Sequence, residues 1–255
     1  MYPVLFKLGN FELRSYGVIV ALSFLLALWV STREAKRKGL DPALIQDFAF
    51  YAFLGGIVGA RIYFVLFSDP AHFLQKPWEI LAIWRGGIGI IGALLGGLSV
   101  ALWYCRKKGL SFWRFADTLA PGAILGQAAG ILACLLNGDS YGKPTDLAWS
   151  IAYTDPSAMA PLNTPLHPVE LYEMAAYLLV FLLIWQTRRR FSTDGFVFLT
   201  FLAGYGAARF AVEFFRGNPA IFALDIPAAQ VFASVLILIA TAGFYLRGAR
   251  RSASP

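Results

Sequence analysis

Seven long apolar stretches, separated by polar segments, dominate the pattern of hydrophobic and polar positions along the chain. They lie near residues 16–31, 48–67, 85–105, 118–136, 168–185, 195–215 and 227–246. A helix needs about 20 mostly apolar residues to cross the hydrocarbon core of a bilayer. The pattern therefore predicts an all-α integral membrane protein, with seven transmembrane helices in a single domain over residues 1–255.

The composition agrees with a membrane protein. Of the 255 residues, 58% are hydrophobic and only 15% are charged, a balance far more apolar than that of a soluble domain. The segment from Met1 to Asn10 lacks the basic start, apolar centre and small-residue cleavage site of a signal peptide. The first apolar stretch is therefore predicted to remain in the protein as a helix.

Basic residues are concentrated in every second connection between the apolar stretches. Four segments hold fourteen of the 22 Lys and Arg residues: Arg33, Lys36, Arg37, Lys38, Arg106, Lys107, Lys108, Arg114, Arg188, Arg189, Arg190, Arg247, Arg250 and Arg251. Because short basic loops stay on the cytoplasmic side, the N-terminus is predicted outside and the C-terminus in the cytoplasm. The net charge of +7 then reflects topology and attraction to anionic lipids, and no nucleic-acid partner is expected.

The longest connections are both predicted to face outward. They cover about residues 68–84 and 137–167, and the second begins with the polar run NGDSYG directly at the end of an apolar stretch. This outward loop is a small irregular periplasmic or extracellular segment, and function is expected at this face. Cys105 and Cys134 have no spacing typical of a disulfide or a metal site, so no metal or cofactor is implied.

Ionisable residues inside the apolar stretches are informative, because burying a charge is costly unless it is paired or hydrated. Tyr205, Arg209 and Glu213 recur every four residues and form one polar stripe on a helix. The stripe has two interpretations: a structural Arg209–Glu213 ion pair, or a site for an anionic ligand. We favour the ligand site, because the stripe and the segment 137–142 are both predicted to lie toward the outer leaflet.

An arginine in an apolar surrounding remains charged and binds a phosphodiester by paired hydrogen bonds, which suggests phospholipid chemistry. The segment HPVELYE at 167–173 brings Tyr172 and Glu173 to the start of another apolar helix. These residues are interpreted either as part of the same site or as an ordinary helix start, where an acidic first turn is favourable.

Five motifs, taken together and in order, resemble the prolipoprotein diacylglyceryl transferase family. They are SYG at 15–17, GAR at 59–61, LNGDSYGKPT at 136–145, HPVELYE at 167–173 and GYGAARFAVEFFR at 204–216. The resemblance runs over nearly the whole chain. It implies a bacterial cytoplasmic (inner) membrane enzyme that transfers the diacylglyceryl group of phosphatidylglycerol to the lipobox cysteine thiol of a preprolipoprotein. The products are a thioether and glycerol-1-phosphate, and the partners are phosphatidylglycerol, preprolipoprotein signal peptides and membrane lipids.

The resemblance also implies roles for individual residues. Arg209 would neutralise the departing phosphate, and Glu213 would orient Arg209. Tyr205 would bond a head-group oxygen, and Asp139 would act as a base or as the partner of a head-group hydroxyl. The residues that would bind substrate are Tyr16, Asn137, Gly138, Gly142, Arg61, Tyr172 and Glu173.

Two positions depart from the family pattern. Ile131 stands where many relatives have an arginine expected to bind phosphate, and Ile91 where they often have a histidine proposed to help deprotonate the thiol. Arg61 or Arg85 is a candidate for supplying the missing charge. An alternative function is therefore that of a non-catalytic or repurposed homologue that still binds phospholipid head groups.

Overall fold

The computed structural model describes residues 4–8, 11–68, 70–83, 86–87, 89–190, 193–223 and 225–252, so Arg85 lies outside the described residues. Seven of its helices are long and apolar enough to cross a membrane. They are α1 (Ser15–Arg37), α2 (Ala43–Phe67), α4 (Ile90–Lys107), α5 (Phe112–Asn137), α6 (Val169–Thr187), α7 (Phe196–Glu213) and α8 (Ala228–Ser252). The predicted all-α membrane protein with seven spans is confirmed.

Four short strands and two short helices complete the described structure. Strands β1 (Val4–Leu8) and β2 (Phe11–Arg14) pair antiparallel, with Phe6 opposite Leu13. Strands β3 (Ile221–Ala223) and β4 (Ile226–Pro227) form a second antiparallel pair. Helix α3 (Pro70–Gln75) and the 3-10 helix η1 (Pro77–Leu81) follow α2 and precede α4 in the sequence.

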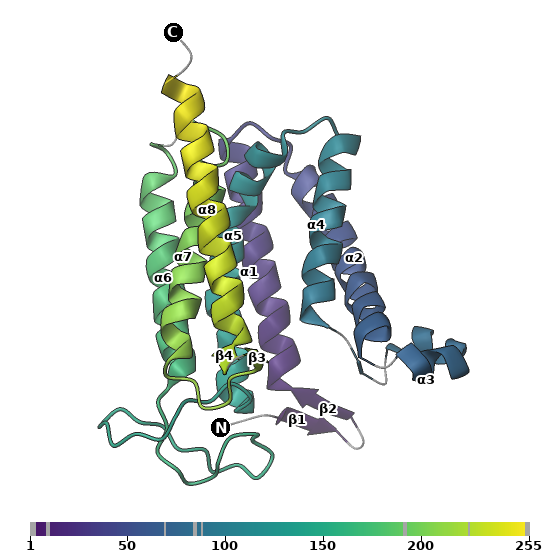
Figure 1. Ribbon diagram of the computed structural model, residues 1–255, viewed down its shortest axis with the longest axis vertical. Coiled ribbons are helices and arrows are strands. Elements are labelled where there is room, and N and C mark those ends of the chain that lie inside the picture. The colour runs from purple at the N-terminus through teal and green to yellow at the C-terminus, as the bar shows by residue number, and fades with distance from the viewer. Residues whose placement is uncertain are drawn as a thin grey trace. The chain divides into compact units, whose positions relative to one another are not determined.

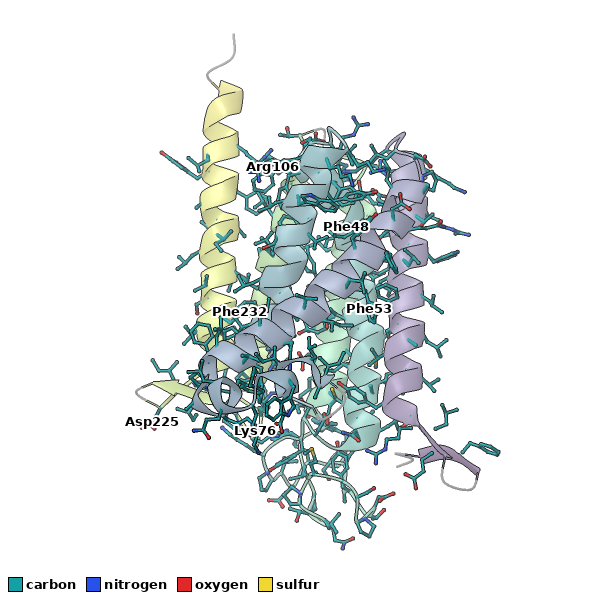
Figure 2. All side chains as sticks on the ribbon, turned by 90° about the vertical axis from the view of Figure 1, so that its right-hand side faces the viewer. Phe48, Phe53, Lys76, Arg106, Asp225 and Phe232 are labelled. Atoms are coloured by element: carbon teal, nitrogen blue, oxygen red, sulfur yellow. The ribbon has the colours of Figure 1, made fainter. Side chains whose placement is uncertain are left out.

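The chain divides into two compact units. Unit 1 comprises residues 1–34 and 116–255, and unit 2 comprises residues 35–115. In unit 1, both strand pairs and the long 138–168 connection lie at one end, which is called the loop end here (Figure 1). The ends of α6 and α8 and the start of α7 lie at the opposite end (Figure 1). In Figure 2, Asp225 marks the turn between β3 and β4.

The core of unit 1 is formed by small and aliphatic side chains of three helices. The cluster joins Ala120, Ile124 and Ala128 of α5 to Tyr177 and Ile184 of α6 and to Val197 and Ala208 of α7. Small residues in these positions allow close helix approach, as is usual in membrane bundles. The core thereby holds α6 and α7 together along the faces that carry the polar residues.

A buried carboxylate fixes the start of α7. Asp117 of α5 is 2% exposed, and its two oxygens accept hydrogen bonds from the backbone N–H groups of Gly195 and Phe198, both at 2.8 Å. The first N–H groups of a helix have no partner within the helix. Asp117 satisfies two of them from a neighbouring helix and so determines where α7 begins.

In unit 2, α2 and α4 pack through glycines. A Cβ atom at Gly59 would overlap the carbonyl oxygen of Gly92, and a Cβ atom at Gly96 would overlap that of Gly55. This is the contact of small residues that brings two membrane helices to backbone distance. At the far end of the pair, where Figure 2 shows Phe48 and Arg106, the hydroxyl of Tyr104 donates to the carbonyl oxygen of Leu44 at 3.0 Å.

Candidate functional site

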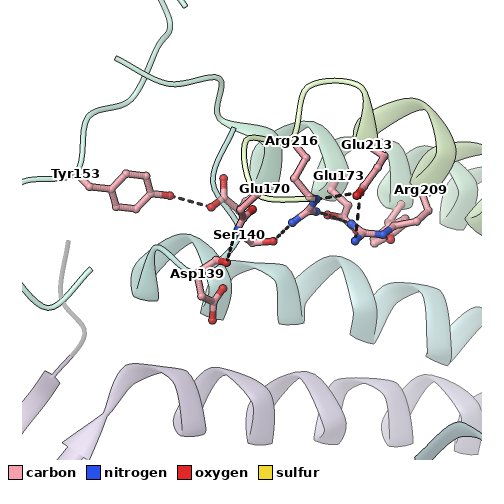
Figure 3. A network of polar contacts seen from close by, with 10 residues as sticks. Asp139, Ser140, Tyr153, Glu170, Glu173, Arg209, Glu213 and Arg216 are labelled. Carbon is pink, nitrogen blue, oxygen red and sulfur yellow. Dashed lines mark hydrogen bonds and ion pairs between the residues drawn. The ribbon is translucent and has the colours of Figure 1, made fainter. Parts of the chain in front are cut away.

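Four charged side chains form one ion-pair network toward the loop end of unit 1 (Figure 3). They are Glu173 of α6, Arg209 and Glu213 of α7, and Arg216 just after α7, and this set is called the charge quartet. The sequence spacing explains three of the members, because residues three, four and seven apart share one face of a helix or of its continuation. Glu173 joins them from the neighbouring helix.

Glu173 lies at the centre of the quartet. One nitrogen of Arg209, Nη1, donates to both of its carboxylate oxygens, at 2.9 and 3.1 Å, and Nη2 of Arg216 donates at 2.9 Å. The Tyr177 hydroxyl adds a bond of 2.6 Å. With a 4% exposed side chain, this carboxylate is buried, and only several charged and neutral donors together make such burial tolerable.

Glu213 is the second acceptor in the quartet. Its Oε2 lies 3.0 Å from Nε of Arg216 and 3.4 Å from Nη2 of Arg209. The Arg209–Glu213 pair, one of the two interpretations of the stripe, therefore exists as the longest link of a larger network, and the favoured ligand site stays a prediction. Arg216 forms the shorter link and was not expected in the site.

Arg209 is the most accessible member of the quartet. Its side chain is 21% exposed, against 7% for Arg216 and 1% for Glu213. No described residue accepts a hydrogen bond from its Nε. A guanidinium that is held on one side by carboxylates and open on the other is suited to binding an anionic group.

The polar segment at residues 137–142 is fastened to the chain just after α7. Nη1 of Arg216 donates to the Ser140 hydroxyl (Figure 3), the N–H of Gly217 donates to the carbonyl oxygen of Tyr141 at 2.9 Å, and the N–H of Lys143 donates to that of Phe215 at 2.8 Å. The quartet and the polar segment therefore form one site.

Gly142 allows the close approach in this region. A Cβ atom at position 142 would overlap the carbonyl oxygen of His167, and one at Gly217 would lie 2.5 Å from the carbonyl oxygen of Gly142. Gly138 has a positive φ of 68° and faces the ring of Tyr153. Both predicted glycines are thus positions where the backbone itself shapes the site.

Asp139 belongs to the same segment, but its carboxylate points away from the quartet in Figure 3. One of its oxygens accepts a bond from the Asn137 side-chain amide at 2.9 Å, and its backbone carbonyl accepts one from the Asn218 amide at 3.0 Å. Asn137 therefore orients Asp139, which remains half-buried. This leaves the carboxylate free of an arginine partner among the described residues.

A third buried carboxylate lies beside the site. Glu170 is 0% exposed, and its Oε1 accepts a bond of 2.8 Å from the Tyr153 hydroxyl, whereas its Oε2 has no partner among the described residues. Burial, followed by the charge of Glu170, raises the pKa of Tyr153. Tyr153 is thereby held as a neutral donor. Neither residue was expected, because a tyrosine in a loop gives no sequence signal of its partner.

The other predicted residues lie in different surroundings. Tyr205 stacks on Tyr177 with ring centroids 5.2 Å apart, and Tyr16 is 42% exposed at the start of α1. The hydroxyl of Tyr172 accepts a bond from Nε1 of Trp149 at 2.8 Å. Ile131 is half-buried on α5. The roles of these residues remain predictions.

Arg61 is in unit 2, and its nitrogens are engaged by backbone. Its Nε donates to the carbonyl oxygen of Ile80 at 2.8 Å, Nη1 to those of Gly86 and Gly87 at 2.7 and 2.8 Å, and Nη2 to that of Glu79. The side chain thus organises the connection before α4. Ile91, at the first turn of α4, is 51% exposed.

The described residues contain no group of three or more His, Cys, Asp or Glu side chains that could hold a metal ion. The open guanidinium of Arg209 and the half-buried carboxylate of Asp139 suit the binding of a phosphorylated head group that also carries hydroxyl groups.

Comparison with known proteins gives a consistent result. A sequence model of the family described as prolipoprotein diacylglyceryl transferase matches residues 3–246. Proteins named phosphatidylglycerol–prolipoprotein diacylglyceryl transferase are similar over most of their length. The one from Aromatoleum aromaticum is 39% identical over 86% of this chain and 84% of its own. The one from Vibrio vulnificus strain YJ016 is 37% identical over 92% of this chain and 88% of its own. The one from Bordetella bronchiseptica is 35% identical over 97% of this chain and 95% of its own.

The family model covers every element of the site, and the relatives come from bacteria. Together with the seven spans, they make this chain a multi-pass bacterial membrane protein that belongs to the prolipoprotein diacylglyceryl transferase family.

Proposed function

We propose that this protein transfers the diacylglyceryl group of phosphatidylglycerol to the lipobox cysteine thiol of a preprolipoprotein, the first step of bacterial lipoprotein maturation. It works in the cytoplasmic (inner) membrane as a single seven-helix domain, with its N-terminus outside and its C-terminus in the cytoplasm. The observation that carries the proposal is Arg209, whose guanidinium is anchored by buried carboxylates and open on its remaining side.

The reaction requires displacement at a glycerol carbon. The cysteine sulfur attacks the carbon of the diacylglyceryl group that is bonded to a phosphate oxygen. This carbon–oxygen bond breaks, and glycerol-1-phosphate leaves with the bonding electrons. The thiol proton passes to a base. Arg209 stabilises the charge that develops on the leaving phosphate, which is electrostatic stabilisation of the transition state.

Asp139 acts near the reacting groups in one of two ways. Its carboxylate either accepts the thiol proton or binds a hydroxyl of the head group, since it is half-buried and oriented by Asn137. Tyr205 supplies a hydroxyl for a head-group oxygen. Tyr16, Gly138, Gly142, Tyr172 and Glu173 shape the surroundings in which the lipid and the signal peptide bind.

The non-catalytic alternative is not favoured. The relatives are named as transferases, and their similarity extends over more than four fifths of this chain. The charge quartet also forms without the arginine that many relatives have at the position of Ile131. Ile131 therefore changes how the phosphate is bound, without abolishing the reaction. The same assay that measures the activity also tests this change.

The test uses the purified full-length protein in detergent with phosphatidylglycerol and a lipobox peptide. Glycerol phosphate release and the mass of the peptide are followed. The parent protein should add a diacylglyceryl mass, and Arg209→Ala should lower the rate by about 10²- to 10³-fold, as expected for losing one donor to a developing anion. Arg33→Ala is the matched control, because Arg33 is an exposed arginine over the ring of Trp29.

Ile131→Arg separates the two functions. A mass gain in the parent that is lost in Arg209→Ala supports the transferase. A gain that appears only in Ile131→Arg means that the parent does not transfer the lipid, and the alternative would then replace the proposal.

A further inference from the structure

Arg216 uses all three of its guanidinium nitrogens within the site. Nε donates to Glu213 at 3.0 Å, Nη2 donates to Glu173 at 2.9 Å, and Nη1 donates to the Ser140 hydroxyl. The residue is 6% exposed, so it has little room for a substrate. Its partners come from α6, α7 and the polar segment after α5, which are distant in sequence and adjacent in Figure 3.

The charges of the quartet balance in pairs. Two carboxylates face two guanidinium groups, and Arg216 is closer than Arg209 to the Oε2 atoms of both Glu213 (3.0 against 3.4 Å) and Glu173 (2.9 against 3.1 Å). If the charge of Arg216 were absent, Arg209 alone would face two carboxylates. The local charge would be negative, and a phosphate approaching Arg209 would be repelled.

We propose that Arg216 is a positioning residue that balances the charges of Glu173 and Glu213 and thereby leaves Arg209 available to an anionic phosphate head group. This inference rests on the proposed transferase function. It assigns the two arginines of one network to different tasks. Arg209 binds the phosphate and Arg216 neutralises the carboxylates that hold Arg209.

Three variants of the full-length protein test this assignment: Arg216→Met, Arg216→Lys, and Arg216→Met combined with Glu213→Gln. In Arg216→Met, the buried carboxylates of Glu173 and Glu213 lose one guanidinium partner and draw Arg209 inward. The KM for phosphatidylglycerol should rise by at least about a hundredfold, which is the lower end of the factor that corresponds to loss of one partner from a buried charge pair. Arg216→Lys keeps the charge and should remain within about tenfold of the parent.

The combined variant discriminates charge balance from simple bridging. Glutamine keeps the shape and an acceptor oxygen at position 213 while removing one negative charge. If Arg216 acts by charge balance, the KM of the combined variant should recover at least tenfold relative to Arg216→Met. If Arg216 only bridges three segments, removing a second charged partner makes the combined variant as poor as, or worse than, Arg216→Met.

Each outcome has a defined meaning. A parent without transfer activity contradicts the proposed function itself. An active parent with no recovery in the combined variant, or with folded Arg216→Lys as impaired as Arg216→Met, overturns the assignment of Arg216. Thermal unfolding in detergent shows which variants fold. If Arg216→Met does not fold, a folded, active Arg216→Lys supports the assignment, and a folded, inactive one contradicts it. Arg33→Met is the control for loss of an arginine elsewhere.

Discussion

At the scale of single residues, the pair Tyr153 and Glu170 shows how the site tolerates a carboxylate away from water. Tyr153 is 0% exposed, and its hydroxyl is the one donor to Glu170 among the described side chains. Leaving a buried acceptor without a donor lowers the free energy of unfolding of a protein by about 1–3 kcal/mol. The bond therefore stabilises the 138–168 connection next to the polar segment.

Tyr153→Phe should lower the free energy of unfolding by about 1–3 kcal/mol at neutral pH, because the Glu170 carboxylate then loses its one described side-chain donor. The folded protein raises the pKa of Tyr153 above its ordinary value of 10.0, so its contribution is complete below that pH. The difference between parent and variant should shrink as the pH rises above this value. Thermal unfolding in detergent across the pH range measures it.

Tyr245→Phe provides the control for this prediction, since Tyr245 is 76% exposed on α8. Its stability should follow that of the parent at every pH. An equal loss in both variants, or a Tyr153→Phe protein as stable as the parent at neutral pH, would contradict the role given to the Tyr153–Glu170 bond.

The sequence predicts residue contacts only where they are local. Arg209 and Glu213 are four apart on one helix, so their contact followed from the spacing. The bond from Arg216 to Ser140 spans 76 residues, and no periodicity reports such a distance. Arg61 was assigned to substrate binding from its motif, but its donors are directed to backbone carbonyls of its own unit, and its predicted role stays untested.

At the scale of elements, the contact between α2 and α4 depends on backbone approach. Gly59 lies against Gly92 and Gly96 so closely that no side chain fits at position 59. Gly97, one residue further along α4, has open space where a Cβ atom would be. The two glycines therefore differ in packing while having the same intrinsic cost in a helix.

Gly59→Ala should weaken the α2–α4 pair, because the new methyl group would overlap backbone that cannot move aside locally; such overpacking costs about 1–3 kcal/mol. Gly97→Ala should leave stability unchanged or raise it by about 0.5–1 kcal/mol. The midpoint of thermal unfolding in detergent measures both. A Gly59→Ala protein as stable as Gly97→Ala would show that the helices are not held at backbone distance.

The long helices were predictable because seven apolar runs of sufficient length leave a helix as the expected structure in a membrane. The two strand pairs were missed, since runs such as Ile226–Pro227 are only two residues long and carry no period. The Asp117 cap on α7 was also missed. It joins positions 78 residues apart, and an acidic residue within an apolar helix does not reveal which helix start it serves.

At the scale of the whole molecule, the orientation in the membrane is a prediction from the positive-inside rule. In unit 1, the arginines after α6 lie at the end opposite the loop end (Figure 1). If this end is cytoplasmic, the charge quartet and the polar segment face the outer leaflet.

Single cysteines test this orientation in a background that lacks Cys105 and Cys134. Ser157→Cys lies in the exposed part of the 138–168 connection. It should react with a membrane-impermeant thiol reagent when the reagent can reach the outer face of the inner membrane and this membrane is still intact. Arg189→Cys, exposed after α6, should react only after the membrane is disrupted. The reverse labelling pattern would contradict the predicted topology and would move the site to the cytoplasmic leaflet.

The charge quartet also has a consequence for biogenesis. Glu173 is synthesised before Arg209 and Arg216, so its carboxylate has no guanidinium partner until α7 has been inserted. An unpaired acidic side chain costs about 2.5–3.5 kcal/mol at the membrane centre on insertion scales and less toward the interface, which favours holding the start of α6 near water during synthesis. The quartet is completed only when six of the seven spans are in place, so an unfinished chain lacks the ion-pair network on which the proposed transfer depends.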